Sequence, residues 1–397
     1  MVALKALQRK RTRIGLDIGV SGIRAVQLTR SANGYVVMNA ACADRPSEPG
    51  AQATGQDPAL AFGVRISPLL PRQIEECLGR GSFHGKAVAA ALSPPDVEFH
   101  TLELPAAVLR AEEVEAAQIV RFEVERLMSN THTPVETRHW LLPQTSVPAP
   151  NAIGTGAAHE IIDRTIELCA EAGLICTDLD TTATALTRFG AVLQSRPKDQ
   201  VWGILDVGDR QARLVLCLDD TPILVRTAGA GGRTWTQHIA DALQVSFKAA
   251  EIHKREHGIA LTGRQTRTSA DEGANSTAKG TEKWGTRSEL ASLILGALRA
   301  DLNDLASEVK RSYEYVLSCY PGRRAADLVL CGGGSLLHYF PEFLGNALGI
   351  PVRRASSYLQ VSGLPSGSPE ACRLRFSAGQ NGPLEVLAVA MGLAIPE

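Results

Sequence analysis

The sequence predicts an α/β fold made of two related halves around a central cleft. Three observations support this prediction. A strand–turn–strand segment with the pattern Asp-x-Gly begins near residue 14, a second begins near residue 201, and a buried strand near residue 327 runs directly into three glycines. A chain of 397 residues is also long enough for two domains with their own hydrophobic cores.

The composition is that of an ordinary globular protein, with 44% hydrophobic and 21% charged residues. A formal net charge of -1 gives no overall field that would attract nucleic acid, so we expect no nucleic-acid partner. No apolar run reaches the roughly 18 residues that a membrane-spanning helix needs, and no apolar segment follows the basic N-terminus as in a secretory signal. The eight cysteines contain no Cys-x-x-Cys pair, which is typical of reduced thiols. We therefore expect a cytoplasmic protein that does not span the membrane.

In the first half, strand patterns are interrupted by one Pro- and Gly-rich stretch at about 43–63, which we expect to be a flexible loop. Helices are expected at 111–128 and at 160–172, the second ended by a glycine. The strands expected in this half are 14–18, 23–28, 35–41, 87–92, 97–104, 135–142 and 175–179.

The second half repeats the opening pattern, with strands at 201–207 and 212–218 around a Gly-Asp turn and a later strand at 327–331. A polar tract at about 262–286 has too few apolar residues to offset its ordering entropy, and we expect a mobile insertion there. The helices expected in this half are 234–245, 248–257, 286 to about 317, and 338–348.

The helix expected at 111–128 has apolar residues on two sides. Ile119 and Phe122 lie opposite its main apolar face. A second apolar face is either further core or a groove for a partner, and both interpretations stay open. The main face comprises Val114, Ala117, Val120, Val124, Leu127 and Met128.

The first candidate site is the turn of the segment GLDIGVSGIR, which follows the first strand. Gly19 and Gly22 would let backbone N–H groups approach an anion closely. Ser21 adds a hydroxyl donor and Arg24 a positive charge, while Asp17 could hold a magnesium ion through water. Taken alone, the segment predicts either a phosphate-binding turn or a polar hairpin.

The second candidate turn repeats this grammar, with Asp206 and Gly208 after the strand at 201–207. Two such hairpins at half-chain spacing indicate a duplicated fold with phosphates held between the halves. The third element is a glycine-rich turn that suits close approach of a nucleoside or phosphate. It comprises Gly332, Gly333, Gly334 and Ser335.

In their order, these motifs resemble the phosphate-1, phosphate-2 and adenosine elements of the actin, Hsp70 and sugar-kinase superfamily. Within it, the chain resembles the PilM family of type IV pilus assembly proteins, which are relatives of the cell-division protein FtsA. The resemblance extends from about residue 13 to 394 outside the two polar insertions. It rests also on LELP at 102–105, EEVE at 112–115, RFEVE at 121–125, LCAEAGL at 168–174, EVKRS at 308–312 and AMGLA at 390–394.

The resemblance implies an actin-like α/β fold, with two ribonuclease-H-like subdomains around a nucleotide cleft and an FtsA-type inserted subdomain. It implies a first subdomain at 1–86 that is completed at 159–199, an inserted subdomain at 87–158, and a second actin-like subdomain at 200–397.

ATP and Mg²⁺ are the implied cofactors. The resemblance places Asp17, Gly19, Ser21, Gly22 and Arg24 on the phosphates, with Asp206 and Gly208 opposite, and lets Asp17 and Asp206 hold Mg²⁺ through water. Gly232, Glu251 and Lys254 would hold ribose and adenine, above Gly332, Gly333 and Gly334, and Ser335 is also predicted to bind the cofactor. Without the resemblance, Glu251 and Lys254 are best interpreted as part of a solvated helix face.

Two stretches depart from the PilM pattern. Asp209, Arg210 and Arg213 stand where PilM proteins usually have small or hydroxylated residues. A carboxylate at Asp209 would repel a triphosphate unless a cation lies between them or the side chain points away. Thr182 also stands near a strand end where an acidic residue is expected. ATP binding is therefore expected, with hydrolysis weak or absent, so that enzymatic activity stays open.

As a function, the resemblance implies a scaffold in the inner-membrane assembly platform of a type IV pilus or a type II secretion-like machine. Such a scaffold would bind the N-terminal cytoplasmic tail of a PilN-like inner-membrane protein and cooperate with the assembly ATPase of the same machine. These partners would hold it at the inner face of the cytoplasmic membrane, with Ile119 and Phe122 as the candidate groove. The alternative is a small-molecule phosphotransferase of the same superfamily, with Asp209 as its carboxylate.

Overall fold

A computed structural model describes residues 11–32, 34–45, 68–108, 113–129, 133–260, 287–359, 374–376 and 383–396. The insertion expected at 262–286 lies outside these ranges, as does the loop expected at 43–63 from residue 46 onward. The first residues of that loop belong to a strand instead, because β3 continues to Asp44 in register with β2.

The first half of the described chain is a six-stranded sheet in the order β14-β3-β2-β1-β4-β8. β1, β2 and β3 form an antiparallel meander, and β4 and β8 continue the sheet parallel to β1. Helices α1 (Leu70–Gly79) and α3 (His159–Glu171) pack on one face, over Ile14 and Leu16. The strands are β1 (Arg11–Ile18), β2 (Gly22–Ser31), β3 (Gly34–Asp44), β4 (Ala87–Leu92), β8 (Ile175–Thr181) and β14 (Leu374–Phe376).

The second half has the same topology, in a five-stranded sheet ordered β11-β10-β9-β12-β13. Its first three strands form an antiparallel meander, and β12 and β13 run parallel to β9. The strands are β9 (Gln200–Val207), β10 (Gln211–Leu218), β11 (Thr221–Ala230), β12 (Arg324–Cys331) and β13 (Val352–Arg354). The helices of this half are α5 (Gly232–Leu243), α6 (Phe247–His257), α7 (Arg287–Cys319) and α8 (Phe340–Leu348).

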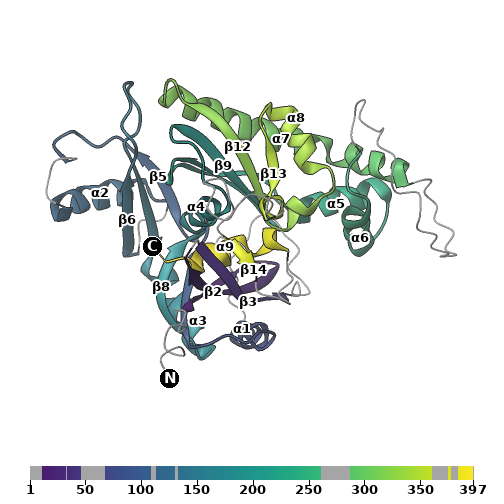
Figure 1. The fold of residues 1–397 in the computed structure, drawn as a ribbon, viewed down its shortest axis with the longest axis horizontal. Coiled ribbons are helices and arrows are strands. Elements are labelled where there is room, and N and C mark those ends of the chain that lie inside the picture. The colour runs from purple at the N-terminus through teal and green to yellow at the C-terminus, as the bar shows by residue number, and fades with distance from the viewer. Residues whose placement is uncertain are drawn as a thin grey trace.

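Two helices lie between the sheets and join the halves. They are α4 (Thr182–Leu193) and α9 (Leu384–Ala394), and Figure 1 shows α9 at the centre, between the strands of the two halves. One buried cluster contains Val26 of the first sheet, Ile204 of the second and residues of both helices. At Gly392 any side chain would overlap the Ala185 carbonyl of α4, so the two helices touch through their backbones. The two halves therefore share one continuous core.

A third, three-stranded sheet in the order β5-β7-β6 stands beside this core, covered by α2 (Glu113–Leu127). Its strands are β5 (Glu98–Leu102), β6 (Val135–Leu141) and β7 (Ala152–Ala158). The Trp140 indole donates to the Pro222 carbonyl at 2.7 Å, and the Thr145 hydroxyl donates to the Cys319 carbonyl at 2.6 Å. These contacts fix the small sheet to the second half.

Strand pairing changes the predicted division of the chain at two places. β4 falls within the predicted insertion 87–158, but it pairs with β1 and β8 of the first sheet, so the inserted segment begins after it. β14 and α9 fall within 200–397, but β14 pairs with β3 and α9 packs against β1 and β2. The rest of the division stays a prediction, as does its FtsA-type character.

The buried face of α2 is rotated relative to the prediction. Val120 and Val124 are buried as expected, but Ala117 is exposed and Leu127 is 40% exposed. The cause lies in β7, where the missing side chains of Gly154 and Gly156 leave room for Val124 and Met128.

This rotation separates the two residues of the candidate groove. Ile119 packs against the small core under α2, whereas Phe122 is 65% exposed.

In the described ranges, no helix is both long and apolar enough to cross a membrane.

Candidate nucleotide-binding site

The two Asp-x-Gly hairpins have the same internal geometry. Arg24 of β2 lies directly across from Asp17 of β1, and Arg213 of β10 lies directly across from Asp206 of β9. The Arg24 Nη1 to Asp17 Oδ2 distance is 3.5 Å, and the Arg213 Nη1 to Asp206 Oδ2 distance is 2.8 Å. Arg213, which the sequence marked as a departure, is therefore the counterpart of Arg24.

The hairpins face each other closely enough for their charges to interact. Burial raises the pKa of Asp17, Arg24 lowers it, and the opposite hairpin contributes as well, with Asp206 raising and Arg213 lowering it. The two carboxylates are 17% and 9% exposed, respectively. The structure thus brings together the two acidic residues that the sequence predicted as partners.

The turn of the first hairpin is held both by backbone hydrogen bonds, including Arg45 N–H to the Ser21 carbonyl at 2.9 Å, and by arginine side chains. Gly19 N–H donates to the Gly22 carbonyl at 2.9 Å, which closes the turn. Arg24 donates to the same carbonyl at 3.2 Å and to Ser21 Oγ at 3.5 Å, and Arg45 donates to the Gly19 carbonyl at 2.9 Å. Gly19 and Gly22 therefore lie at a turn with both backbone and side-chain supports.

The turn of the second hairpin is bonded to the start of α5. Gly232 N–H donates to the Gly208 carbonyl at 2.9 Å, and Arg233 N–H donates to the Asp209 carbonyl at 2.7 Å. Gly231 N–H donates to the Arg210 carbonyl at 2.9 Å. Backbone groups that a helix start usually leaves unpaired are thus satisfied by the turn itself.

Asp209, expected to repel a triphosphate, lies among cations. Burial raises its pKa, while Arg233, Lys254 and Arg210 all lower it. Burial outweighs these cations, so the pKa of Asp209 stays above its ordinary value and the charged form is not favoured.

Lys254 and Glu251 form a buried pair rather than the solvated face that the sequence pattern alone indicated. Lys254 Nζ donates to the Gly232 carbonyl at 2.9 Å, to Thr236 Oγ1 at 2.6 Å and to Glu251 Oε2 at 2.6 Å. An ammonium group has three N–H donors, so these contacts use all of them. Burial lowers the pKa of Lys254, although Glu251 opposes this effect. Lys254 thus fixes the start of α5, next to the second turn.

The glycine-rich turn lies against Asp206. Gly332 has φ +78°, and a side chain there would overlap Asp206 Oδ1 and the Val207 carbonyl. Gly333, in contrast, has no described atom within 4 Å of the position of a side chain, so it borders open space. Gly334 packs against Val207.

Ser335, predicted to bind the cofactor, is fully buried, and its hydroxyl donates to the Gly332 carbonyl at 2.7 Å. In this structure Ser335 closes the turn. Gly333 is the residue of this turn that offers a surface.

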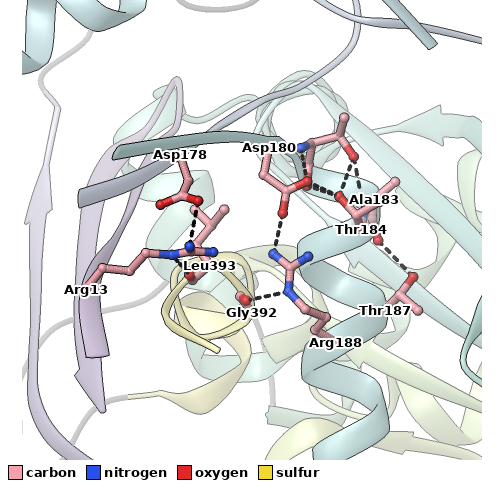
Figure 2. A network of polar contacts seen from close by, with 10 residues as sticks. Arg13, Asp178, Asp180, Ala183, Thr184, Thr187, Arg188, Gly392 and Leu393 are labelled. Carbon is pink, nitrogen blue, oxygen red and sulfur yellow. Dashed lines mark hydrogen bonds and ion pairs between the residues drawn. The ribbon is translucent and has the colours of Figure 1, made fainter. Parts of the chain in front are cut away.

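Sequence reasoning missed the contacts that hold α9, shown in Figure 2. Arg13 of β1 donates to the Leu393 carbonyl at 3.3 Å and pairs with Asp178 at 2.7 Å. Arg188 of α4 donates to the Gly392 carbonyl at 3.1 Å and pairs with Asp180, which also accepts from Thr184. Cations at these carbonyls stabilise the C-terminal end of the helix.

At the other end of α9, the Glu385 carbonyl accepts from Gly332 N–H at 2.9 Å. One buried helix therefore connects the first sheet to the glycine-rich turn. Asp180 belongs to this structural network, close to Thr182, where the sequence led us to look for an acidic residue.

This architecture, with two duplicated halves on shared central helices, is the fold of the actin-like ATPases. The family described as "Type IV pilus assembly protein PilM" matches residues 15–262. This is more than half of the chain, which therefore belongs to the PilM family of type IV pilus assembly proteins. The family of the cell division protein FtsA matches residues 204–366.

Among solved structures, the chain is similar to the PilM-PilN type IV pilus biogenesis complex, with 24% identity, a TM-score of 0.68, and coverage of 96% of this chain and 97% of that one. It is also similar to the ethanolamine utilization protein EutJ from Carboxydothermus hydrogenoformans (14% identity, TM-score 0.49, coverage 98% and 90%). A third similar structure is MreB5 of Spiroplasma citri bound to ADP (12% identity, TM-score 0.47, coverage 97% and 95%). No curated protein sequence matches the chain.

Proposed function

We propose that this protein is a nucleotide-binding scaffold of a type IV pilus or type II secretion-like assembly platform. The single observation that carries nucleotide binding is the pair of facing Asp–Arg hairpins next to the open backbone at Gly333. Guanidinium groups and exposed backbone are the features that bind phosphates and nucleosides in other proteins. ATP is the proposed ligand.

We further propose that it binds the N-terminal cytoplasmic tail of a PilN-like inner-membrane protein. Membership of the PilM family and similarity to a PilM-PilN complex support this partner. Through that tail, and together with the assembly ATPase of the same machine, the protein would act in the cytoplasm at the inner face of the membrane.

The exposed side of α2 is the proposed contact for the tail. Phe122 is the most exposed large hydrophobic side chain in the described ranges, at 65%. Since Ile119 packs against the core under α2, we assign the contact to Phe122 and give Ile119 a supporting role. Exposed aromatic residues are frequent anchors of protein interfaces.

A labelled peptide with the sequence of such a tail tests the partner and the contact. We expect Phe122→Ser to weaken peptide binding at least about tenfold, as loss of an aromatic anchor does. Ile175→Ser is the matched control, because Ile175 is 60% exposed on the edge strand β8 of the first sheet. Failure of the wild type to bind the peptide would remove the partner. Equal losses in both variants would remove α2 as the site.

The phosphotransferase alternative receives no support from the contacts of Asp209. Arg210, Arg233 and Lys254 lie close enough to lower the pKa of the carboxylate that would have to act in that reaction. Nucleotide binding without phosphoryl transfer is the function that these residues support best.

A further inference from the structure

The two acidic residues predicted to hold Mg²⁺ do not form a site that suits this ion. Magnesium takes oxygen ligands in octahedral geometry, usually from carboxylates and water. Here each carboxylate is already paired with an arginine across its own hairpin, at 3.5 Å for Asp17 and 2.8 Å for Asp206. The residues present therefore disagree with a magnesium-centred site.

The same pairing places two guanidinium groups, those of Arg24 and Arg213, at the site. The side chains of Arg24 and Arg213 are 16% and 21% exposed, so both are largely buried. Their charges cancel those of the two carboxylates, and a polyphosphate that enters meets two guanidinium groups and no uncompensated carboxylate from these pairs. Guanidinium groups bind phosphate oxygens through two parallel hydrogen bonds, which makes arginine a strong phosphate ligand.

Arg213 also carries an unused donor. Its Nη1 is bonded to Asp206, but its Nε is buried and has no hydrogen-bond partner within the described chain. A buried donor without an acceptor is costly, and native structures leave few of them. A phosphate oxygen is an acceptor that would satisfy this group.

We infer that Arg24 and Arg213 hold the phosphates of the nucleotide in place of a divalent cation, so that nucleotide binding does not require Mg²⁺. The inference rests on the proposed nucleotide binding and defines its ligand as a metal-free nucleoside polyphosphate. It also assigns a role to Arg213, one of the three neighbouring residues that depart from the family pattern.

Titration of the full chain with a fluorescent ATP analogue, in Mg²⁺ buffer and in EDTA buffer, tests the inference directly. We expect dissociation constants within about threefold of each other, since the two guanidinium groups offer the same hydrogen-bond donors to the phosphates in both buffers. Binding in Mg²⁺ buffer but not in EDTA would overturn the inference and leave the proposed nucleotide binding intact. Binding in neither buffer would overturn both.

The variant Arg213→Met sharpens the test. It should lose at least about tenfold in affinity in EDTA, because one of two phosphate ligands is gone. Part of the loss should be recovered in Mg²⁺, because Asp206 is then free to approach an ion. The double variant Asp206→Asn with Arg213→Met leaves no unpaired buried charge if the single variant is unstable, and it should bind weakly in both buffers.

Arg226→Met is the matched control for the removal of one arginine from the second sheet. Arg226 of β11 lies across from Leu214, on the face covered by α7, and pairs with Glu308 of that helix. The variant Arg226→Met should bind the fluorescent ATP analogue with the affinity of the wild type. Affinity in EDTA that is equal in wild type and Arg213→Met would contradict the role of Arg213.

Discussion

The two hairpins of the cleft share their sequence grammar and strand register but differ in how their turns are held. Arginine side chains support the first turn: Arg24 donates to the Gly22 carbonyl and Arg45 donates to the Gly19 carbonyl. The second is bonded through backbone groups to the start of α5, with Gly332 packed against Asp206. Side-chain supports exchange partners easily, whereas backbone supports do not. The comparison thus indicates that the second turn is anchored to a helix, whereas the first depends in part on side chains.

The packing of the second turn is most sensitive to a substitution at Gly332. Gly332→Ala should destabilise the protein by about 3 kcal/mol or more, because the new methyl group adds backbone strain and overlaps Asp206 and Val207. Thermal or denaturant unfolding measures this effect. Gly333→Ala is the control next in sequence, and it should unfold like the wild type because the side-chain position borders open space. Similar losses in both variants would show that the second turn is not tightly packed.

Lys254 tests whether the second turn depends on its support through α5. Lys254→Met keeps the aliphatic stem but leaves Glu251 without its buried partner, so we expect a loss of about 2 kcal/mol in unfolding free energy. Arg255→Met removes the other cation that pairs with Glu251. Because the side chain of Arg255 is 77% exposed, this change should cost no more than about 0.5 kcal/mol. A neutral Lys254→Met would instead favour the predicted contact with ribose or adenine.

Removing each carboxylate charge compares the two hairpins directly. Asp206→Asn should cost about 1–2 kcal/mol, since it weakens a charged hydrogen bond of 2.8 Å. Asp17→Asn should instead raise the melting temperature slightly at neutral pH. Destabilisation of equal size in both variants would mean that the two hairpins are equivalent.

The sign for Asp17 follows from its pKa, which burial raises above the ordinary value of 3.8. The folded state binds this proton more tightly, so the stabilisation is complete below pH 3.8 and is lost as the pH rises through the folded pKa. At neutral pH the ionised carboxylate is therefore a net cost, which asparagine removes. The advantage of Asp17→Asn should shrink as the pH falls toward about 4, and melting curves across that range measure it.

Much of the fold and the position of the cleft could be predicted from the sequence, because the motifs are local. The hairpins at Asp17 and Asp206 and the turn at Gly332 each occupy a few adjacent residues, and their order indicated the actin-like fold. The pairing of Arg213 with Asp206 was also within reach. It has the same seven-residue spacing as that of Asp17 and Arg24, which the antiparallel register places face to face.

The central helices could not be predicted in the same way. α4 has no polar stripe, because it lies between two sheets and is buried on nearly all sides. Arg13 reaches Leu393 across 380 residues of sequence, and no local pattern signals such a contact. The rotation of α2 likewise depends on Gly154 and Gly156 of another strand, which the helix periodicity does not reveal.

Binding of a nucleotide between the two hairpins is tested most directly by calorimetric titration of ATP into the wild type, Arg24→Met and Gly333→Val. The account predicts one binding site of roughly micromolar affinity in the wild type, with losses of at least about tenfold, or ~1.4 kcal/mol, in both variants. Gly333→Val should bind ATP poorly but have the melting temperature of the wild type. The reason is that the valine side chain enters only the open space beside the turn. No ATP binding by the wild type, or equal binding by all three proteins, would contradict the account.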